Sequence, residues 1–155
     1  MFNKKIMQKA ILLSEKNIEN GGGPFGAVIV KDGKIIATGC NRVTCNNDPT
    51  AHAEVTAIRN ACKKIGDFNL AGCEIYSSCE PCPMCLSAIY WARISKLYYG
   101  NTKKDAAKIG FDDSFIYDEL EKKPIERAIP ASQHLRQEAI MAFKKWEKND
   151  SKIKY

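Results

Sequence analysis

Three cysteines at steps of three, Cys79, Cys82 and Cys85, constrain this chain more than any other feature. Cysteines at this density form a disulfide element, a redox pair or a set of metal ligands. The whole chain carries seven cysteines, an odd number, and the interrupted apolar residues near its first position do not make a secretory signal. These observations indicate a reducing, cytoplasmic compartment, in which thiols stay free or bind metal. We therefore expect metal ligands rather than disulfides.

A further candidate ligand, His52, stands in the motif AHAE, two residues before Glu54. Soft thiolates combined with one imidazole select zinc. The apolar pattern predicts that His52 and Glu54 lie in the first turn of one helix, and that Cys82 and Cys85 lie in the first turn of the next. Helix dipoles favour anionic thiolates at such positions. The sequence thus predicts one zinc ion per chain, bound where two helices begin.

Two kinds of zinc site are compatible with these residues. Cys79 could join His52, Cys82 and Cys85 as a fourth ligand and close a structural site. Alternatively, three ligands leave one position for water, and Glu54 carries the proton that this water must lose. Zinc-dependent base deaminases show H-x-E followed by P-C-x-x-C, with the glutamate as acid and base. This chain has HAE and PCPMC in that order, so we favour the open, catalytic site.

The length of 155 residues suits one domain with a buried core, which we expect to span residues 1–155. Helices are predicted over 3–19, about 51–64 and 82–92, and strands on both sides of Asp32-Gly33, over 73–78 and over 94–100. Asp48 or Thr50, at the end of a polar loop over 41–49, is expected to cap the second helix. The strand–helix–strand order over 73–100 predicts that its two strands are parallel.

The pattern beyond Asn101 is weaker. It predicts short helices near 103–109 and 114–120, a short strand around 126–129 and a final helix over about 134–147. The formal charge of +6 permits a nucleic-acid partner. However, the lysine doublets are dispersed among acidic residues, which favours a solvated surface, and no apolar run is long enough to cross a membrane. A noncatalytic, zinc-stabilised nucleic-acid-binding module stays as the non-enzymatic alternative.

Four segments, GGPFGAVIVKDGKIIATGCN, NDPTAHAEVTAIRNAC, SCEPCPMCLSAIYWARI and GFDDSFIYDEL, together resemble the bacterial guanine deaminases of the cytidine deaminase superfamily. The resemblance covers nearly the whole chain. HAE and PCxxC are shared with tRNA adenosine deaminases and with cytosine and cytidylate deaminases, whereas GFDDSFIY and IYWAR are similar to the guanine deaminases. The resemblance implies an α/β fold, three-layer α/β/α with a mixed central sheet, and hydrolysis of guanine to xanthine and ammonia in purine catabolism or salvage. Deamination of tRNA adenosine, or of another small base such as cytosine, is the enzymatic alternative.

The resemblance also implies roles for individual residues. His52, Cys82 and Cys85 hold zinc with water as the fourth ligand, and Glu54 is the catalytic proton carrier. Cys79 is left out of this set, and we interpret it as a packed thiol near the metal.

Three residues are predicted to bind the flat purine base. Phe25 either stacks on the base or is a core residue at the start of a strand. Asn41 can both donate and accept hydrogen bonds, and the resemblance places it against the purine. Asp113 is implied as the acceptor for the N–H donors of guanine, although Asp112 stands beside it and Asp113 could instead cap the helix that begins near Ser114.

The last residue, Tyr155, would ordinarily belong to a frayed terminus. The resemblance implies instead that a C-terminal segment, about 130–155, swaps across a homodimer. Tyr155 then covers the substrate of the partner subunit. The partners expected of this chain are therefore a small purine base and a second copy of itself, with no membrane and no nucleic acid.

Overall fold

The central element of this computed structural model, which describes residues 1–155, is a four-stranded sheet. Its strands are β1 (Gly26–Lys31), β2 (Lys34–Cys40), β3 (Cys73–Cys79) and β4 (Lys96–Asn101), in the order β2-β1-β3-β4. The chain divides into the unit Met1–Asp113, which contains the sheet, and the unit Ser114–Tyr155. We describe each unit by itself.

The sheet is mixed, as predicted. β1 pairs antiparallel with β2 and with β3, whereas β3 and β4 are parallel. The hairpin between β1 and β2 turns at Asp32 and Gly33, whose φ angles of 49° and 74° are both left-handed. Such a pair of angles defines the two-residue hairpin turn that Asp-Gly sequences favour. The local sequence signal was therefore sufficient to place these two strands.

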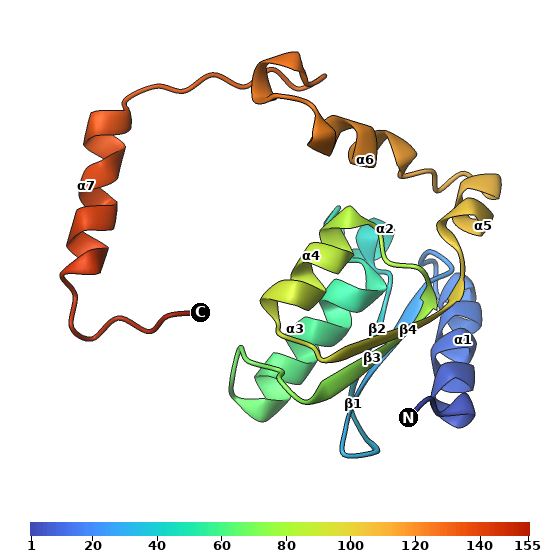
Figure 1. Ribbon diagram of the computed structural model, residues 1–155. Helices are drawn as coiled ribbons and strands as arrows, with labels where there is room; N and C mark the ends of the chain where they lie inside the picture. Colours follow the sequence, from blue (N-terminus) through green and yellow to red (C-terminus); the bar gives the residue numbers. More distant parts are fainter. The chain divides into compact units, whose positions relative to one another are not determined.

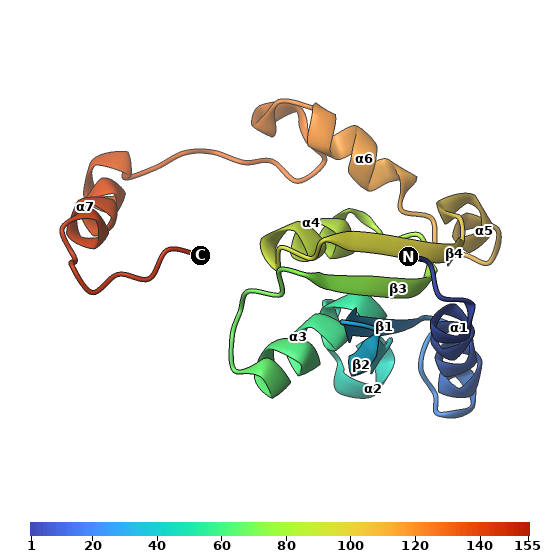
Figure 2. The ribbon, with the colours of Figure 1, turned by 60° about the horizontal axis from the view of Figure 1, so that its bottom comes forward.

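Helices cover both faces of the sheet (Figures 1 and 2). α1 (Lys4–Glu19) lies on one face, and α3 (Ala53–Ile65) and α4 (Pro83–Trp91) lie on the other. Alternate residues of β1 point to opposite faces. One face packs with α1 into a core cluster of Ile6, Met7, Ala10, Val28, Val30 and Tyr76. The other packs with α3 and α4 into a cluster that includes Ala27, Ile29, Ala53, Ala57, Ile75 and Ile89. The predicted three-layer α/β/α architecture is confirmed.

The start of α3 lies unusually close to β2. α3 presents small residues, including Ala53 and Ala57, to the sheet, and both are fully buried. A Cβ added to Gly39 of β2 would lie 2.3 Å from the carbonyl oxygen of Ala53 and 2.4 Å from the backbone nitrogen of Ala57. Since no side chain fits between them, this close approach positions the N-terminus of α3, where two of the predicted site residues lie.

The predicted cap of this helix was wrong. α3 begins at Ala53 with His52 as its N-cap residue, and the His52 side chain makes no capping hydrogen bond. The Asp48 carboxylate instead accepts from the backbone N–H and the hydroxyl of Thr50, at 2.8 and 2.7 Å. Both candidate caps are therefore engaged in a local turn of the kind that aspartate favours. The preceding polar loop also contains one short helix, α2 (Val43–Asn46).

The first unit ends after α5 (Lys103–Lys108), and the second unit contains α6 (Ser114–Glu121), the 3₁₀ helix η1 (Pro124–Glu126) and α7 (Arg136–Glu147). The short strand predicted around 126–129 was wrong. The backbone N–H of Ala128 donates to the Glu119 carboxylate at 2.6 Å, and Arg127 Nε donates to the Glu119 carbonyl oxygen at 3.0 Å. This segment thus bonds to α6 instead of to a neighbouring strand. None of the helices in the chain combines the length and the apolar character needed to cross a bilayer.

Candidate active site

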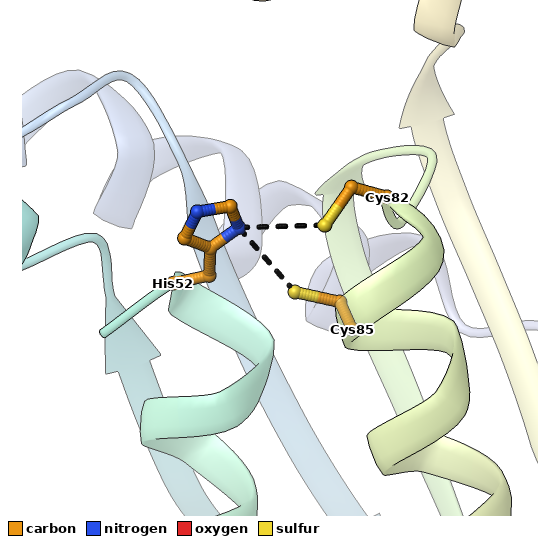
Figure 3. A group of neighbouring side chains, drawn as sticks. All are labelled: His52, Cys82 and Cys85. Atoms are coloured by element: carbon orange, nitrogen blue, oxygen red, sulfur yellow. Dashed lines mark hydrogen bonds between the residues drawn. The ribbon is translucent and has the colours of Figure 1, made fainter. Parts of the chain in front are cut away.

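Three of the predicted site residues meet where α3 and α4 begin. His52 is the N-cap residue of α3, Cys82 is the N-cap residue of α4, and Cys85 lies in the first turn of α4. Figure 3 shows the two sulfur atoms directed toward the same nitrogen of the imidazole ring. His52 Nδ1 lies 3.5 Å from Cys82 Sγ and 3.5 Å from Cys85 Sγ. The potential ligand atoms of the three residues all lie within 4.8 Å of one another.

These distances fit a zinc ion. Zinc bonds of about 2.3 Å to sulfur and about 2.0 Å to imidazole nitrogen, at tetrahedral angles, place the nitrogen and the sulfur about 3.5 Å apart. Both measured Nδ1–Sγ distances have this value. The donor set of one imidazole and two thiolates is also the one that zinc prefers. His52, Cys82 and Cys85 would therefore hold the ion and leave one tetrahedral position for another ligand.

Neighbouring groups shift the pKa values of the two thiols in opposite directions. A hydrogen bond from the Cys85 thiol, opposed by burial and aided by His52, lowers the pKa of Cys82 to about 4. The hydrogen bond with Cys82 in turn raises the pKa of His52. Cys85, next to this thiolate and buried, has a raised pKa. Zinc requires deprotonated ligands, so metal binding at this cluster releases protons.

Cys79 is not part of the cluster. Its thiol donates to the carbonyl oxygen of Thr102, with a sulfur–oxygen distance of 3.6 Å. Burial, with a smaller contribution from the Glu54 carboxylate, raises the pKa of the Cys79 thiol to about 11. The ligand atoms that lie within 4.8 Å of one another belong to His52, Cys82 and Cys85, and the Cys79 sulfur is not among them. The arrangement matches the expectation of a packed thiol beside the metal centre and not the closed four-ligand site.

The side chains of Glu54 and His52 face the same cavity, although the two residues are only two positions apart in the sequence. Residues two apart on a helix point in different directions. His52, however, has extended backbone angles, with φ −67° and ψ 159°, and the helix begins after it. Both side chains can therefore line the same cavity, and both do. Glu54 is only 5% exposed, and its Oε1 accepts a hydrogen bond of 2.8 Å from the hydroxyl of Ser77. Sequence reasoning missed Ser77, because no motif marks it.

A cavity of about 310 Å³ opens beside the cluster. This volume lies at the lower end of the range of small-molecule sites. It is lined by the predicted residues Phe25, Asn41, His52, Glu54, Cys82 and Asp113, and also by Gly23, Val43, Thr44, Cys79, Glu80, Lys103, Ala106, Phe111 and Asp112. The cavity lining thus includes every predicted site residue of the first unit except Cys85, which is buried and lies 3.5 Å from His52 Nδ1.

One wall of the cavity is aromatic. Phe25 and Phe111 meet edge to face, with ring centroids 5.0 Å apart and an angle of 89° between the rings. Such pairs hold each other's orientation. Phe111 was not predicted, although its position next to Asp112 in the GFDDSF segment was an available signal. Phe25 is partly buried, so it both packs against Phe111 and lines the cavity.

Polar groups lie on the other walls. The Asn41 side-chain oxygen accepts from the backbone N–H of Val43 at 3.3 Å. The Asn17 amide of α1, 3% exposed, donates to the carbonyl oxygens of Asn41 and Gly23, at 2.7 and 2.8 Å. α1 therefore holds two segments of the cavity wall together. Burial, and secondarily the Cys82 thiolate, raises the pKa of Asp113.

Tyr155, the remaining predicted residue, belongs to the second unit, where it is 71% exposed.

Comparisons with known proteins show a matching family and similar relatives. Residues 1–101 match the family described as the cytidine and deoxycytidylate deaminase zinc-binding region. The chain is 53% identical to the guanine deaminase of Bacillus subtilis, and the match covers all of both chains. It superposes on the crystal structure of guanine deaminase from Bacillus subtilis with a TM-score of 0.97 and 52% identity, covering 100% of this chain and 99% of that one. It is also 46% identical to the tRNA-specific adenosine deaminase of Agrobacterium fabrum, over 61% of this chain and 62% of that protein.

The matched region contains the sheet, both helix starts and the whole cluster of His52, Cys82 and Cys85. The chain therefore belongs to the zinc-binding cytidine and deoxycytidylate deaminase family.

Proposed function

We infer that this protein is a zinc-dependent aminohydrolase that converts guanine to xanthine and ammonia. The observation that carries this inference is the extent of the similarity. The match to a guanine deaminase runs through the whole chain, including the second unit, whereas the matches to tRNA adenosine deaminases cover 61% to 72% of it. The substrate of an enzyme depends on the residues that surround it in the binding site, and a match over the full length includes all of these residues.

We assign each residue of the site a role in the reaction. We assign the binding of zinc to His52, Cys82 and Cys85, because their ligand atoms have the spacing that zinc requires. When bound, zinc lowers the pKa of a water molecule to near 7 and so supplies a nucleophile at neutral pH. Glu54 takes the proton of the attacking water and returns it to the leaving amino group, which departs as ammonia. Its burial at the cavity wall keeps this proton exchange away from bulk water.

The purine is proposed to lie in the cavity against three side chains. Phe25, braced edge-on by Phe111, offers a ring face for stacking on the base. The Asn41 side-chain oxygen is engaged by Val43, which leaves the amide nitrogen to donate to an acceptor on the purine ring. Asp113 lines the cavity and is the acceptor proposed for the N–H groups of guanine.

The second unit supports the proposal of a swapped homodimer. None of its residues is buried. Its exposed apolar side chains include Phe115, Leu120, Ile125, Ile129, Leu135, Met141, Phe143, Trp146 and Ile153. A segment with this many apolar groups and no core of its own gains stability by packing on another surface. We assign that surface to a second copy of the chain, with residues of about 130–155 exchanged and Tyr155 closing the partner's cavity.

The cellular setting is proposed to be the cytoplasm. All seven cysteines are free, and a reducing compartment keeps the two ligand thiols available for zinc. The reaction would serve purine catabolism or salvage, since it removes an amino group from a free purine base.

The substrate assignment is tested by ammonia release from guanine, from cytosine and from an adenosine-containing tRNA anticodon stem-loop. We expect turnover of guanine at a kcat/KM at least about 100-fold above that for the other two, because a site built for specific hydrogen bonds strongly rejects a ligand that lacks them. Turnover of the stem-loop alone would assign the protein to the tRNA-modifying enzymes. Zinc binding without turnover of any base, together with RNA binding that weakens steeply with salt, would support the noncatalytic alternative.

The swap is tested by mixing two inactive variants, Tyr155→Ala and Glu54→Gln. In a swapped dimer, the mixed species has one site with an intact Glu54 and a Tyr155 from the other chain. Random exchange at equal amounts should therefore restore about a quarter of the wild-type activity. Lys154→Ala, the neighbouring exposed residue, is the control for Tyr155→Ala and should keep full activity. No recovery after verified exchange of subunits would mean that Tyr155 does not act across the dimer.

A further inference from the structure

Ser77 interrupts an apolar face of β3. On this face, Cys73 and Ile75 pack into the core between the sheet and the helices α3 and α4. Ser77 is the next residue on the same face, because side chains of a strand alternate, and it is 1% exposed. A buried hydroxyl is costly unless it is hydrogen-bonded, and valine or isoleucine would suit a buried strand better. The hydroxyl at this position therefore calls for a specific partner.

That partner is the proton carrier of the proposed reaction. Ser77 Oγ donates to Glu54 Oε1 at 2.8 Å, and both side chains are buried. A hydrogen bond to a carboxylate is stronger than one between neutral groups. The last torsion of a glutamate side chain is otherwise broadly distributed. The bond from β3 thus selects one orientation of a carboxylate that is carried by α3.

We propose that Ser77 is a positioning residue for the deamination reaction and acts through Glu54. It engages one carboxylate oxygen and leaves Oε2 to take the proton from the attacking water and to return it to the leaving amino group. This inference rests on the proposed function of Glu54. Because proton transfer requires the donor and the acceptor at hydrogen-bond distance, an unheld carboxylate loses turnover without losing affinity for the purine.

A pair of substitutions isolates the hydroxyl. Threonine and valine have nearly the same shape, and only threonine can donate to Glu54. In the zinc-loaded protein we expect Ser77→Thr to keep kcat within about threefold of the wild type. Ser77→Val should lower kcat by about 10- to 100-fold, the effect of a misplaced catalytic group. KM for guanine and the zinc content should stay unchanged in both variants. If the added methyl groups prevent folding, Ser77→Ala is compared with the wild type by the same three measurements.

Equal kcat values for Ser77→Thr and Ser77→Val would overturn the proposal. A loss of kcat in Ser77→Val that is accompanied by a lower zinc content or a changed KM would also overturn it, since this would indicate a structural role. If the proposed function itself were wrong, the wild-type protein would release no ammonia from guanine. Crystal structures of the zinc-loaded Ser77→Thr and Ser77→Val variants test the orientation of the Glu54 carboxylate directly. A Glu54 carboxylate that has rotated in Ser77→Val but not in Ser77→Thr supports the positioning role, and an unchanged carboxylate in both overturns it.

Discussion

Glu54→Gln is expected to lower kcat for guanine by about 10²- to 10⁴-fold while one zinc ion per chain stays bound. Glutamine has nearly the size of glutamate and can still accept the hydrogen bond from Ser77, which donates to Oε1 at 2.8 Å. It cannot take up and return a proton, so the hydrolytic step loses its acid and base together. Steady-state ammonia release and zinc analysis on the same preparation measure both quantities.

Glu74→Gln is the matched control for this variant. Glu74 is a partly buried glutamate that pairs with Lys96 and the chain's amino group, and it does not line the active-site cavity. We expect its kcat to equal that of the wild type. Turnover by Glu54→Gln at the wild-type rate would contradict the role of Glu54 as proton carrier. Loss of zinc from Glu54→Gln would show instead that Glu54 helps to hold the metal.

The second large effect concerns the metal ligands. Cys85→Ser is expected to lower zinc affinity by more than about 100-fold and to abolish detectable turnover, because even residues one shell away from a metal contribute 10- to 100-fold. The serine hydroxyl does not ionise at neutral pH and is a poor ligand for zinc. Zinc content after dialysis against a weak chelator, followed by the activity assay, checks this result.

Cys79→Ser distinguishes an open zinc site with three protein ligands from a closed site with four. Its thiol donates to the Thr102 carbonyl oxygen and lies outside the ligand cluster, so this variant should keep one zinc ion per chain. Serine can donate the same hydrogen bond. If Cys79→Ser lost zinc as completely as Cys85→Ser, Cys79 would be a fourth ligand and the site would be structural rather than catalytic.

Much of the fold was predictable because its signals are local. The Asp32-Gly33 pair specifies a turn through backbone angles that few residue pairs adopt. The apolar pattern of residues 3–19 predicted α1, and the helix predicted over about 51–64 is α3, which ends at Gly66 with a φ of 76°. The strand at 126–129 failed for a non-local reason. A short segment becomes a strand only when another strand offers its backbone, and here the α6 residue Glu119 accepts from the backbone N–H of Ala128.

The sequence by itself determined the chemistry of the metal site, because zinc selects residue types, and the order HAE…PCPMC supplies one imidazole, two thiolates and one carboxylate. Only the tertiary structure decided how these groups face one another. It placed His52 before the first turn of α3, so that Glu54 can line the same cavity, and it brought Ser77 and Phe111 from distant positions in the chain to the carboxylate and to Phe25. The physical reason is that ligand identity depends on single side chains, whereas orientation depends on packing between elements that are far apart in sequence.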